Sequence, residues 1–161
     1  MKDLRIRSAV PEDAAALLRI YAYYVENTAV SQELAVPTAE EFEKRIRATL
    51  PRYPYLVLEE DGAPRGYAYA GPFKARGGYA RSCELSIYLD RDARGRGFGR
   101  LLYEELEARL REAGMRNLYA CLADSDEEDA YLTHGSERFH RRMGFVRVGT
   151  FHGCARKGRP L

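Results

Sequence analysis

The segment that most constrains the fold is a turn rich in glycine and arginine, residues 94–99. Residues 83–89 precede it and alternate like a half-buried strand, with one face formed by Leu85, Ile87 and Leu89 and the other by Glu84, Ser86 and Tyr88. The residues that follow the turn place one leucine on each helical turn, as in an amphipathic helix: Leu102, Leu106 and Leu110. The sequence therefore predicts a strand, a turn and a helix in succession.

Such a turn is suited to binding an anion. Glycine lets the backbone approach a ligand closely, and the N-terminus of a helix offers free N–H groups and a positive partial charge. The side chains of Arg94, Arg96 and Arg100 add full charges, so a phosphate or pyrophosphate is the expected guest. A solvated turn without a ligand is the alternative. The turn lacks the Gly-Lys-Ser/Thr ending of a Walker loop, and its spacing differs from that of a dinucleotide-binding turn.

The rest of the chain alternates between helix and strand patterns. A first helix is expected to begin at Pro11, with a buried stripe formed by Ala14, Leu17, Leu18, Tyr21 and Val25. A second is expected after the capping box that begins at Thr38, and a third over residues 136–143. Short strands are expected at residues 4–7, 55–59, 65–70, 117–122 and 145–151, with a turn at Asp61-Gly62.

Composition excludes several classes of protein. A chain of 161 residues with 45% hydrophobic and 31% charged residues fits one globular domain, residues 1–161. A net charge of +2 gives no strong electrostatic case for nucleic acid, and no apolar run approaches the length of a signal or membrane-spanning segment. Cys83, Cys121 and Cys154 are odd in number and far apart, which favours reduced thiols in a cytoplasmic protein over disulfides or a zinc site.

Arg94, Gly97 and Gly99 match the Arg-x-x-Gly-x-Gly loop that holds the pyrophosphate of acetyl-CoA in the GNAT superfamily of N-acetyltransferases. Further motifs follow the same order along nearly the whole chain, at residues 23–28, 52–57, 67–76, 84–89, 136–140 and 144–145. Together they resemble the phosphinothricin acetyltransferases and their relatives, which acetylate the amine of amino-acid-like compounds.

The resemblance implies an α/β (α+β) GNAT fold, a mixed and mostly antiparallel sheet flanked by helices and splayed where acetyl-CoA enters. It implies transfer of acetyl from acetyl-CoA to the amine of a small acceptor of the phosphinothricin or methionine sulfoximine type, by direct attack in a ternary complex and without a metal. Relatives continue with a final aromatic-rich strand, whereas this chain ends after about residue 154 in a basic tail. The missing strand would leave a sheet edge open, and we expect a homodimer that covers it.

The resemblance also assigns residues that hold the cofactor. The backbone of Ile87, Tyr88 and Leu89 would pair with the pantetheine arm. The pyrophosphate would lie on the turn, Arg94, Gly95, Arg96, Gly97, Phe98, Gly99 and Arg100. The segment near the cofactor would contribute Thr133, Ser136 and Phe139, although the family often has asparagine where Thr133 stands.

Two residues are candidates for the chemistry. Glu84 lies on the polar face of the strand before the turn and matches the family glutamate, so it is the expected base for the acceptor ammonium; a salt-bridged surface carboxylate is the alternative. His140 matches the histidine of the phosphinothricin branch and would either donate a proton to the departing thiolate or serve a structural role. His134 and His152 are expected at the surface or in packing, and the three histidines lack metal-ligand spacing.

The acceptor is expected to contact residues before and on the same strand: Phe73, Lys74, Arg76, Tyr79, Glu84 and Ser86. Family substrates carry a carboxylate, which an arginine fork or a lysine would bind, whereas a solvated loop charge is the alternative for Lys74. The acidic stretch 124–129 is expected to be a solvated loop that borders the acceptor entrance or has no role there.

Other functions stay open from the sequence. The alternatives are an acceptor amine on a protein N-terminus or a polyamine, and a catalytically weak module that binds acyl-CoA. RNA binding is disfavoured because aromatic residues do not interleave with the arginines as stacking platforms.

Overall fold

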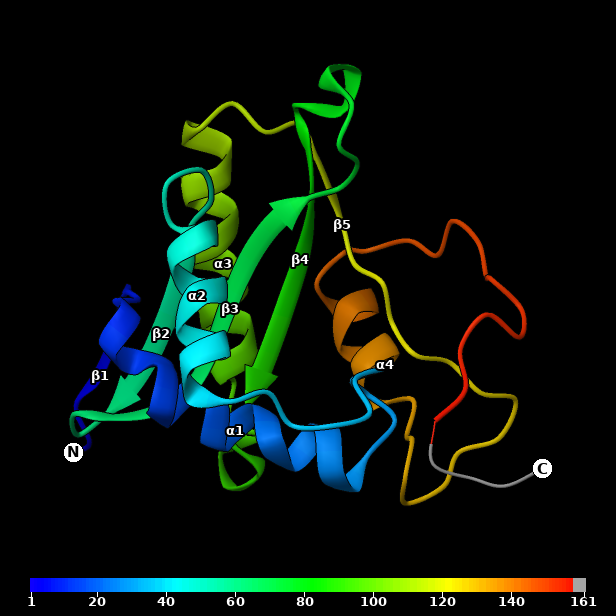
Figure 1. The fold of residues 1–161 in the computed structure, drawn as a ribbon, viewed down its shortest axis with the longest axis horizontal. Helices are drawn as coiled ribbons and strands as arrows, with labels where there is room; N and C mark the ends of the chain where they lie inside the picture. The colour runs from blue at the N-terminus through cyan, green and yellow to red at the C-terminus, as the bar shows by residue number, and fades with distance from the viewer. Residues whose placement is uncertain (158–161) are drawn as a thin grey trace. The chain divides into compact units, whose positions relative to one another are not determined.

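A mixed sheet forms the centre of the fold in the computed structural model, which describes residues 1–157 (Figure 1). Within these residues its five strands lie side by side in sequence order: β1 (Leu4–Ser8), β2 (Tyr55–Glu60), β3 (Ala63–Pro72), β4 (Ser82–Leu89) and β5 (Asn117–Tyr119). The three pairs formed by the first four strands are antiparallel, and β5 is parallel to β4. The mixed, mostly antiparallel sheet predicted above is confirmed.

Four α-helices accompany the sheet within the described residues: α1 (Ala14–Asn27), α2 (Ala39–Thr49), α3 (Phe98–Glu112) and α4 (Gly135–Arg142). Short 3-10 turns lie at Pro11–Asp13, Gly77–Tyr79 and Arg91–Ala93. The helix start expected at Pro11 is therefore a 3-10 turn that runs directly into α1.

The described chain forms two compact units. The first contains Met1–Tyr21 and Pro37–Cys121, and therefore the whole sheet, α2 and α3. The second contains Ala22–Val36 and the chain after Cys121, including α4. The single domain expected from the sequence stays a prediction.

In the first unit, helices cover both faces of the sheet. On one face, Phe42 of α2 and Tyr21 of α1 contact the rings of Tyr67 and Tyr88, which are cross-strand partners on β3 and β4. On the other face α3 contacts β2, β3 and β4. Gly66 lies on the α3 side, where a side chain on it would collide with Leu89. Figure 1 shows α2 in front of β3 and α3 behind it.

Local sequence rules hold at several element ends. The side chain of Thr38 accepts a hydrogen bond from the backbone N–H of Glu41, which caps α2 as the capping box predicts. Asp61 and Gly62 have positive φ angles of 52° and 80°, as a two-residue hairpin turn between β2 and β3 requires. The predicted stripe of α1 is buried except at Leu18, which is half-buried.

The prediction of a strand at residues 145–151 is wrong, because the structure has no strand there. Val146, Val148 and Phe151 are 81%, 87% and 86% exposed. Alternating apolar residues form a strand only beside a partner that accepts their backbone hydrogen bonds, and β5 ends at Tyr119 instead of residue 122. Residues 154–157 also form no strand, and the remainder of the tail prediction, residues 158–161, lies outside the described residues.

Candidate active site

The glycine-arginine turn joins β4 to α3 as the sequence predicts. Gly95 and Gly97 have φ angles of 74° and 81°, a left-handed conformation that glycine adopts without strain. Gly97 caps α3, since its carbonyl accepts the N–H of Leu101 at 3.2 Å. The first N–H groups of α3 therefore lack partners within the helix and are available to an anion. A β-carbon built on Gly95 or Gly97 meets no atom within 4 Å, so both glycines border open space.

Glu60, at the end of β2, fixes this turn to the sheet. Both of its carboxylate oxygens accept hydrogen bonds from the guanidinium of Arg96, one of them at 3.1 Å. The carboxylate also lies 3.5 Å from Lys2 Nζ and 3.6 Å from Arg65 Nε. The Glu60 side chain is only 6% exposed. A forked pair of this kind has a defined geometry, so it sets the position of the turn relative to β2.

The three arginines of the turn, Arg94, Arg96 and Arg100, have different surroundings. The Arg96 guanidinium also lies over the Phe98 ring, 4.5 Å from its centre. Arg100 donates to Glu104 at 2.6 Å on the surface of α3, and Arg94 Nε lies 3.5 Å from the Arg91 carbonyl. Arg96 is thus the arginine that anchors the turn, whereas Arg94 and Arg100 have exposed side chains.

The pKa of Glu60 reflects this cluster. The hydrogen bonds from Arg96, followed by its charge and that of Lys2, lower the pKa of Glu60 to about 2 against the effect of burial. Glu60 therefore stays ionised at any pH at which the protein works. Its stabilising effect is complete above the ordinary carboxyl pKa of 4.5 and is lost as the pH falls towards 2.

Glu84, Ser86 and Tyr88 share one face of β4, as the alternation predicts. Their cross-strand partners on β3 are Gly71, Tyr69 and Tyr67, respectively. The pairing between β4 and β5 covers only Ser82 to Glu84 and ends where Glu84 lies opposite Tyr119, while β4 itself continues to Leu89. Glu84 is half-buried and so lies where the two parallel strands separate.

The thiol of Cys121, just after β5, is a neighbour of Glu84 that the sequence did not indicate. Burial raises the pKa of Cys121, and the charge of Glu84 and a hydrogen bond with it raise it further. The charge of Lys74 lowers the pKa of the same thiol, so the Lys74 ammonium is also close enough to act on Cys121. A carboxylate and an ammonium thus border one small area of the first unit.

An aromatic cluster lies beside Glu84. The Phe73 ring stacks on Tyr119 with centres 4.4 Å apart and meets the edge of Tyr79 at 6.0 Å. Lys74 Nζ lies 5.2 Å from the centre of the Phe73 ring. The structure thus brings together three of the predicted acceptor contacts, Phe73, Lys74 and Tyr79. Arg76 is exposed and its carbonyl begins the 3-10 turn at Gly77–Tyr79.

The remaining predicted residues belong to the second unit. Thr133 is exposed, and its hydroxyl accepts the N–H of Gly135 at 3.3 Å before α4 begins. Ser136 and Phe139 are half-buried on α4. His140 is 4% exposed, and its ring meets the edges of Phe139 and Phe145, each at 5.2 Å between centres. That these residues join the first unit in one site stays a prediction.

The hydrogen bonding of His140 bears on its chemistry. Nδ1 lies 2.7 Å from the backbone carbonyl oxygen of Ser136, and a carbonyl only accepts, so Nδ1 carries the proton. Burial lowers the pKa of His140, which favours the neutral ring. A neutral ring protonated at Nδ1 has no proton on Nε2. This arrangement favours the structural role of His140 over the role of proton donor.

Glu60, Cys121 and Tyr119 are the neighbours of the candidate site that sequence reasoning missed. Glu60 follows another glutamate at a strand end and resembles any solvated charge in the sequence. Its contacts depend on the pairing of β2 with β1 and β3, which brings Lys2 and Arg65 beside it. No local pattern carries that information.

A family model described as "Acetyltransferase (GNAT) domain" matches residues 6–160. The chain belongs to the GNAT acetyltransferase family. It is 32% identical over 169 residues to a phosphinothricin N-acetyltransferase of Streptomyces coelicolor, covering 96% of this chain and 89% of that relative. The resemblance to this branch is therefore confirmed, and the protein is an N-acetyltransferase that uses acetyl-CoA as its acyl donor.

Solved structures agree with this family and fold. A phosphinothricin acetyltransferase from Sinorhizobium meliloti in complex with acetyl-CoA aligns with a TM-score of 0.80 at 32% identity, covering 94% of this chain and 83% of that one. A ribosomal-protein-alanine N-acetyltransferase from Brucella melitensis aligns with a TM-score of 0.86 at 34% identity, covering 95% and 91%. The GNAT fold expected from the sequence is confirmed.

Two features are absent from residues 1–157. None of the helices there combines the length and apolar character needed to cross a bilayer. No group of three or more histidine, cysteine, aspartate or glutamate side chains in that range is placed to hold a metal ion.

We expect Glu60→Gln to weaken acetyl-CoA binding by about tenfold, because an amide replaces the carboxylate that holds Arg96 and with it the turn. Isothermal titration of acetyl-CoA measures this. Glu107→Gln is the matched control, since it removes an exposed ion pair with Arg111 further along α3 and should change the affinity by less than about twofold. Equal affinities of the folded Glu60→Gln variant and the wild type would contradict the anchoring role.

The contact between Glu84 and Cys121 makes a second prediction. Glu84→Gln removes a negative charge that raises the pKa of the thiol, so a larger fraction of Cys121 should be thiolate and react faster with iodoacetamide. Peptide mass spectrometry after timed alkylation measures the rate at Cys121. The exposed Cys154 serves as the internal control in the same samples. An unchanged rate at Cys121 would show that the two side chains are not in contact.

Proposed function

We propose that this acetyltransferase acetylates the α-amine of a small amino-acid-like acceptor, of the phosphinothricin or methionine sulfoximine type, by direct attack in a ternary complex. The observation that carries the proposal is the position of Glu84, half-buried where β4 and β5 separate and beside an aromatic cluster with a lysine. This arrangement provides a proton acceptor, an apolar wall and a cation within one unit.

The residues of the turn fit the pyrophosphate of acetyl-CoA, which supplies the acetyl group as a thioester. Gly95 and Gly97 border open space, and the N-terminus of α3 presents N–H groups and a positive partial charge. In this proposal Arg94 and Arg100 contribute charge, Arg96 positions the turn through Glu60, and the backbone of residues 87–89 pairs with the pantetheine arm. Gly99, buried in the first turn of α3, lets the helix start close to the ligand.

Glu84 acts in this proposal as the general base. An α-amine arrives as ammonium and must lose a proton before its nitrogen attacks the thioester carbon. The Glu84 carboxylate takes that proton directly or through a water molecule. The nitrogen then bonds to the thioester carbon and loses its second proton to solvent. The C–S bond breaks, and the thiolate leaves with the rest of the donor and takes a proton from solvent. His140 holds α4 and the Phe145 segment together and is not assigned the proton transfer to sulfur.

The acceptor lies against the aromatic cluster in this proposal. Phe73, Tyr79 and Tyr119 exclude water from one side of the amine, which strengthens electrostatic contacts within the site. Lys74 and the exposed Arg76 offer cations for the acceptor carboxylate, and Ser86 lies two residues beyond Glu84 on the same face of β4. A homodimer and a cytoplasmic location stay predictions.

A second candidate acceptor is the N-terminal amine of a protein. The specific observation in its favour is the alignment with the Brucella melitensis structure, which is named a ribosomal-protein-alanine N-acetyltransferase. A peptide has no free carboxylate beside its α-amine, so it would not use a cation such as Lys74 in the way a free amino acid would. The two acceptors therefore differ in how strongly they depend on a carboxylate.

We expect Glu84→Gln to lower turnover by roughly 10²- to 10⁴-fold, the usual scale of general-base catalysis, while acetyl-CoA affinity stays unchanged. The acid limb of the pH–rate profile should change as well, since it reports the essential base. Thiol release with an amino-acid acceptor measures turnover, and calorimetry measures the affinity.

Glu107→Gln again provides the control and should keep wild-type turnover. Wild-type turnover of Glu84→Gln across the pH range would return Glu84 to the role of a surface carboxylate. If no amine causes thiol release while acetyl-CoA still binds, the chain is an acyl-CoA-binding module instead of an active transferase.

A further inference from the structure

A pocket between α2 and the sheet, distinct from the aromatic cluster of Phe73, lies wholly within the first unit. It has a cavity volume of about 60 Å³. Tyr55, Tyr67 and Tyr69 line it from the sheet, Phe42 and Arg45 from α2, and Tyr21 from α1. Neither the turn nor Glu84 contributes to its wall, so the role proposed above does not account for it.

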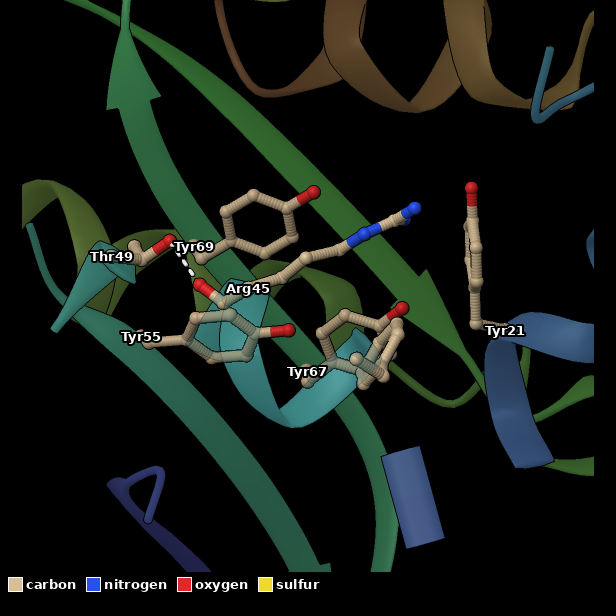
Figure 2. Close-up of a pocket in the computed structure, with 7 residues that line it drawn as sticks. Tyr21, Arg45, Thr49, Tyr55, Tyr67 and Tyr69 are labelled. Carbon is tan, nitrogen blue, oxygen red and sulfur yellow. Dashed lines mark hydrogen bonds between the residues drawn. The ribbon is translucent and has the colours of Figure 1, made fainter. Parts of the chain in front are cut away.

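Three tyrosine rings form one wall of this pocket. Tyr55 and Tyr69 are cross-strand partners whose rings stack 4.7 Å apart, and Tyr67 lies nearly parallel to both. Figure 2 shows their hydroxyl groups and the guanidinium of Arg45 pointing to the same side. The rings are apolar walls, and the groups at their ends are hydrogen-bond donors.

Arg45 is the charged side chain that lines the pocket. Burial raises the pKa of Tyr55 and Tyr67, so both phenols stay neutral at working pH, and the charge of Arg45 acts on Tyr55. Arg45 is 42% exposed and its ion pair with Glu41, one helical turn away, has an N···O distance of 3.8 Å. An exposed ion pair of this kind contributes little, so an incoming anion can displace Glu41 from the guanidinium.

The strand register places the pocket near Glu84. Tyr69 lies directly opposite Ser86, and Glu84 is two residues further along the same face of β4. Diagonal neighbours across such a pair are separated by about 7–8 Å. An acceptor whose α-amine lies at Glu84 therefore has its side chain within reach of Tyr69 and the mouth of the pocket.

We propose that this pocket binds the side chain of the acceptor and selects side chains that end in a carboxylate or another oxyanion, with Arg45 and the Tyr69 hydroxyl as the specificity-determining groups. The proposal rests on the proposed function, because it places the acceptor amine at Glu84. The tyrosine rings contact the methylene groups of the side chain, and the guanidinium and phenols donate hydrogen bonds to its terminal oxygens. A cationic side chain is repelled by Arg45.

The test compares three acceptors by thiol release: L-glutamate, its neutral isostere L-glutamine and L-alanine, whose side chain does not reach the pocket. We expect the wild type to prefer glutamate to glutamine. Arg45→Met should lower kcat/KM for glutamate by about 10- to 100-fold, mainly through KM, while kcat/KM for alanine stays within about twofold. Tyr69→Phe should cause a smaller loss of the same pattern.

Arg47→Met is the matched control, because Arg47 lies on the same helix and pairs with Glu43 at the surface. It should leave all three acceptors unchanged. Equal losses for glutamate and alanine in Arg45→Met, or no loss for either, would overturn the pocket proposal and leave the proposed function standing. Phosphinothricin and methionine sulfoximine are assayed alongside. If the wild type acetylates these two but none of the three amino acids, the pocket proposal fails and the proposed function stands, whereas inactivity on all five acceptors overturns the proposed function.

Discussion

The register between β3 and β4 is the constraint on which the first unit depends. Successive side chains of a strand point to opposite faces, so a slip by one residue would turn Glu84 and Ser86 towards α3 and place Leu85 among the tyrosines. The register is fixed by burial on both faces. Tyr67 and Tyr88 pack against α1 and α2, and Gly66 leaves room for Leu89 on the side of α3. One ladder thus positions the proposed base, the aromatic cluster and the tyrosine pocket together.

A second interaction ties the anion-binding turn to this sheet. A turn with two left-handed glycines is flexible by itself, because glycine restricts the backbone least. Glu60 compensates by holding Arg96 with both carboxylate oxygens, within a cluster that includes Lys2 and Arg65. The arginine that appears from the sequence to be a phosphate ligand therefore has a structural partner. We therefore expect the affinity for acetyl-CoA to depend on Glu60, which lies 36 positions away from Arg96 in the sequence and need not touch the ligand.

Much of the fold follows from local pattern, and the parts that do not follow depend on distant partners. The alternation of residues 84–89, the leucine stripe of α3 and the capping threonine of α2 predicted their elements because each pattern reports burial or a local hydrogen bond. The same reasoning failed at residues 145–151, since alternation cannot show whether a partner strand exists. Glu84 was identified by a motif, whereas Glu60, Cys121 and the tyrosine pocket depend on strand register and were not found.

The central claim is that the acceptor is a free amino-acid-like amine that is deprotonated at Glu84, and the acetylated product tests it most directly. The enzyme is incubated with acetyl-CoA and an equimolar mixture of free L-amino acids, phosphinothricin, methionine sulfoximine, spermidine and a peptide with N-terminal alanine, and the products are identified by mass spectrometry. The account predicts acetyl groups on the α-amines of the free amino acids or their analogues, and their loss with Glu84→Gln. Acetylation of the peptide or spermidine alone would contradict it.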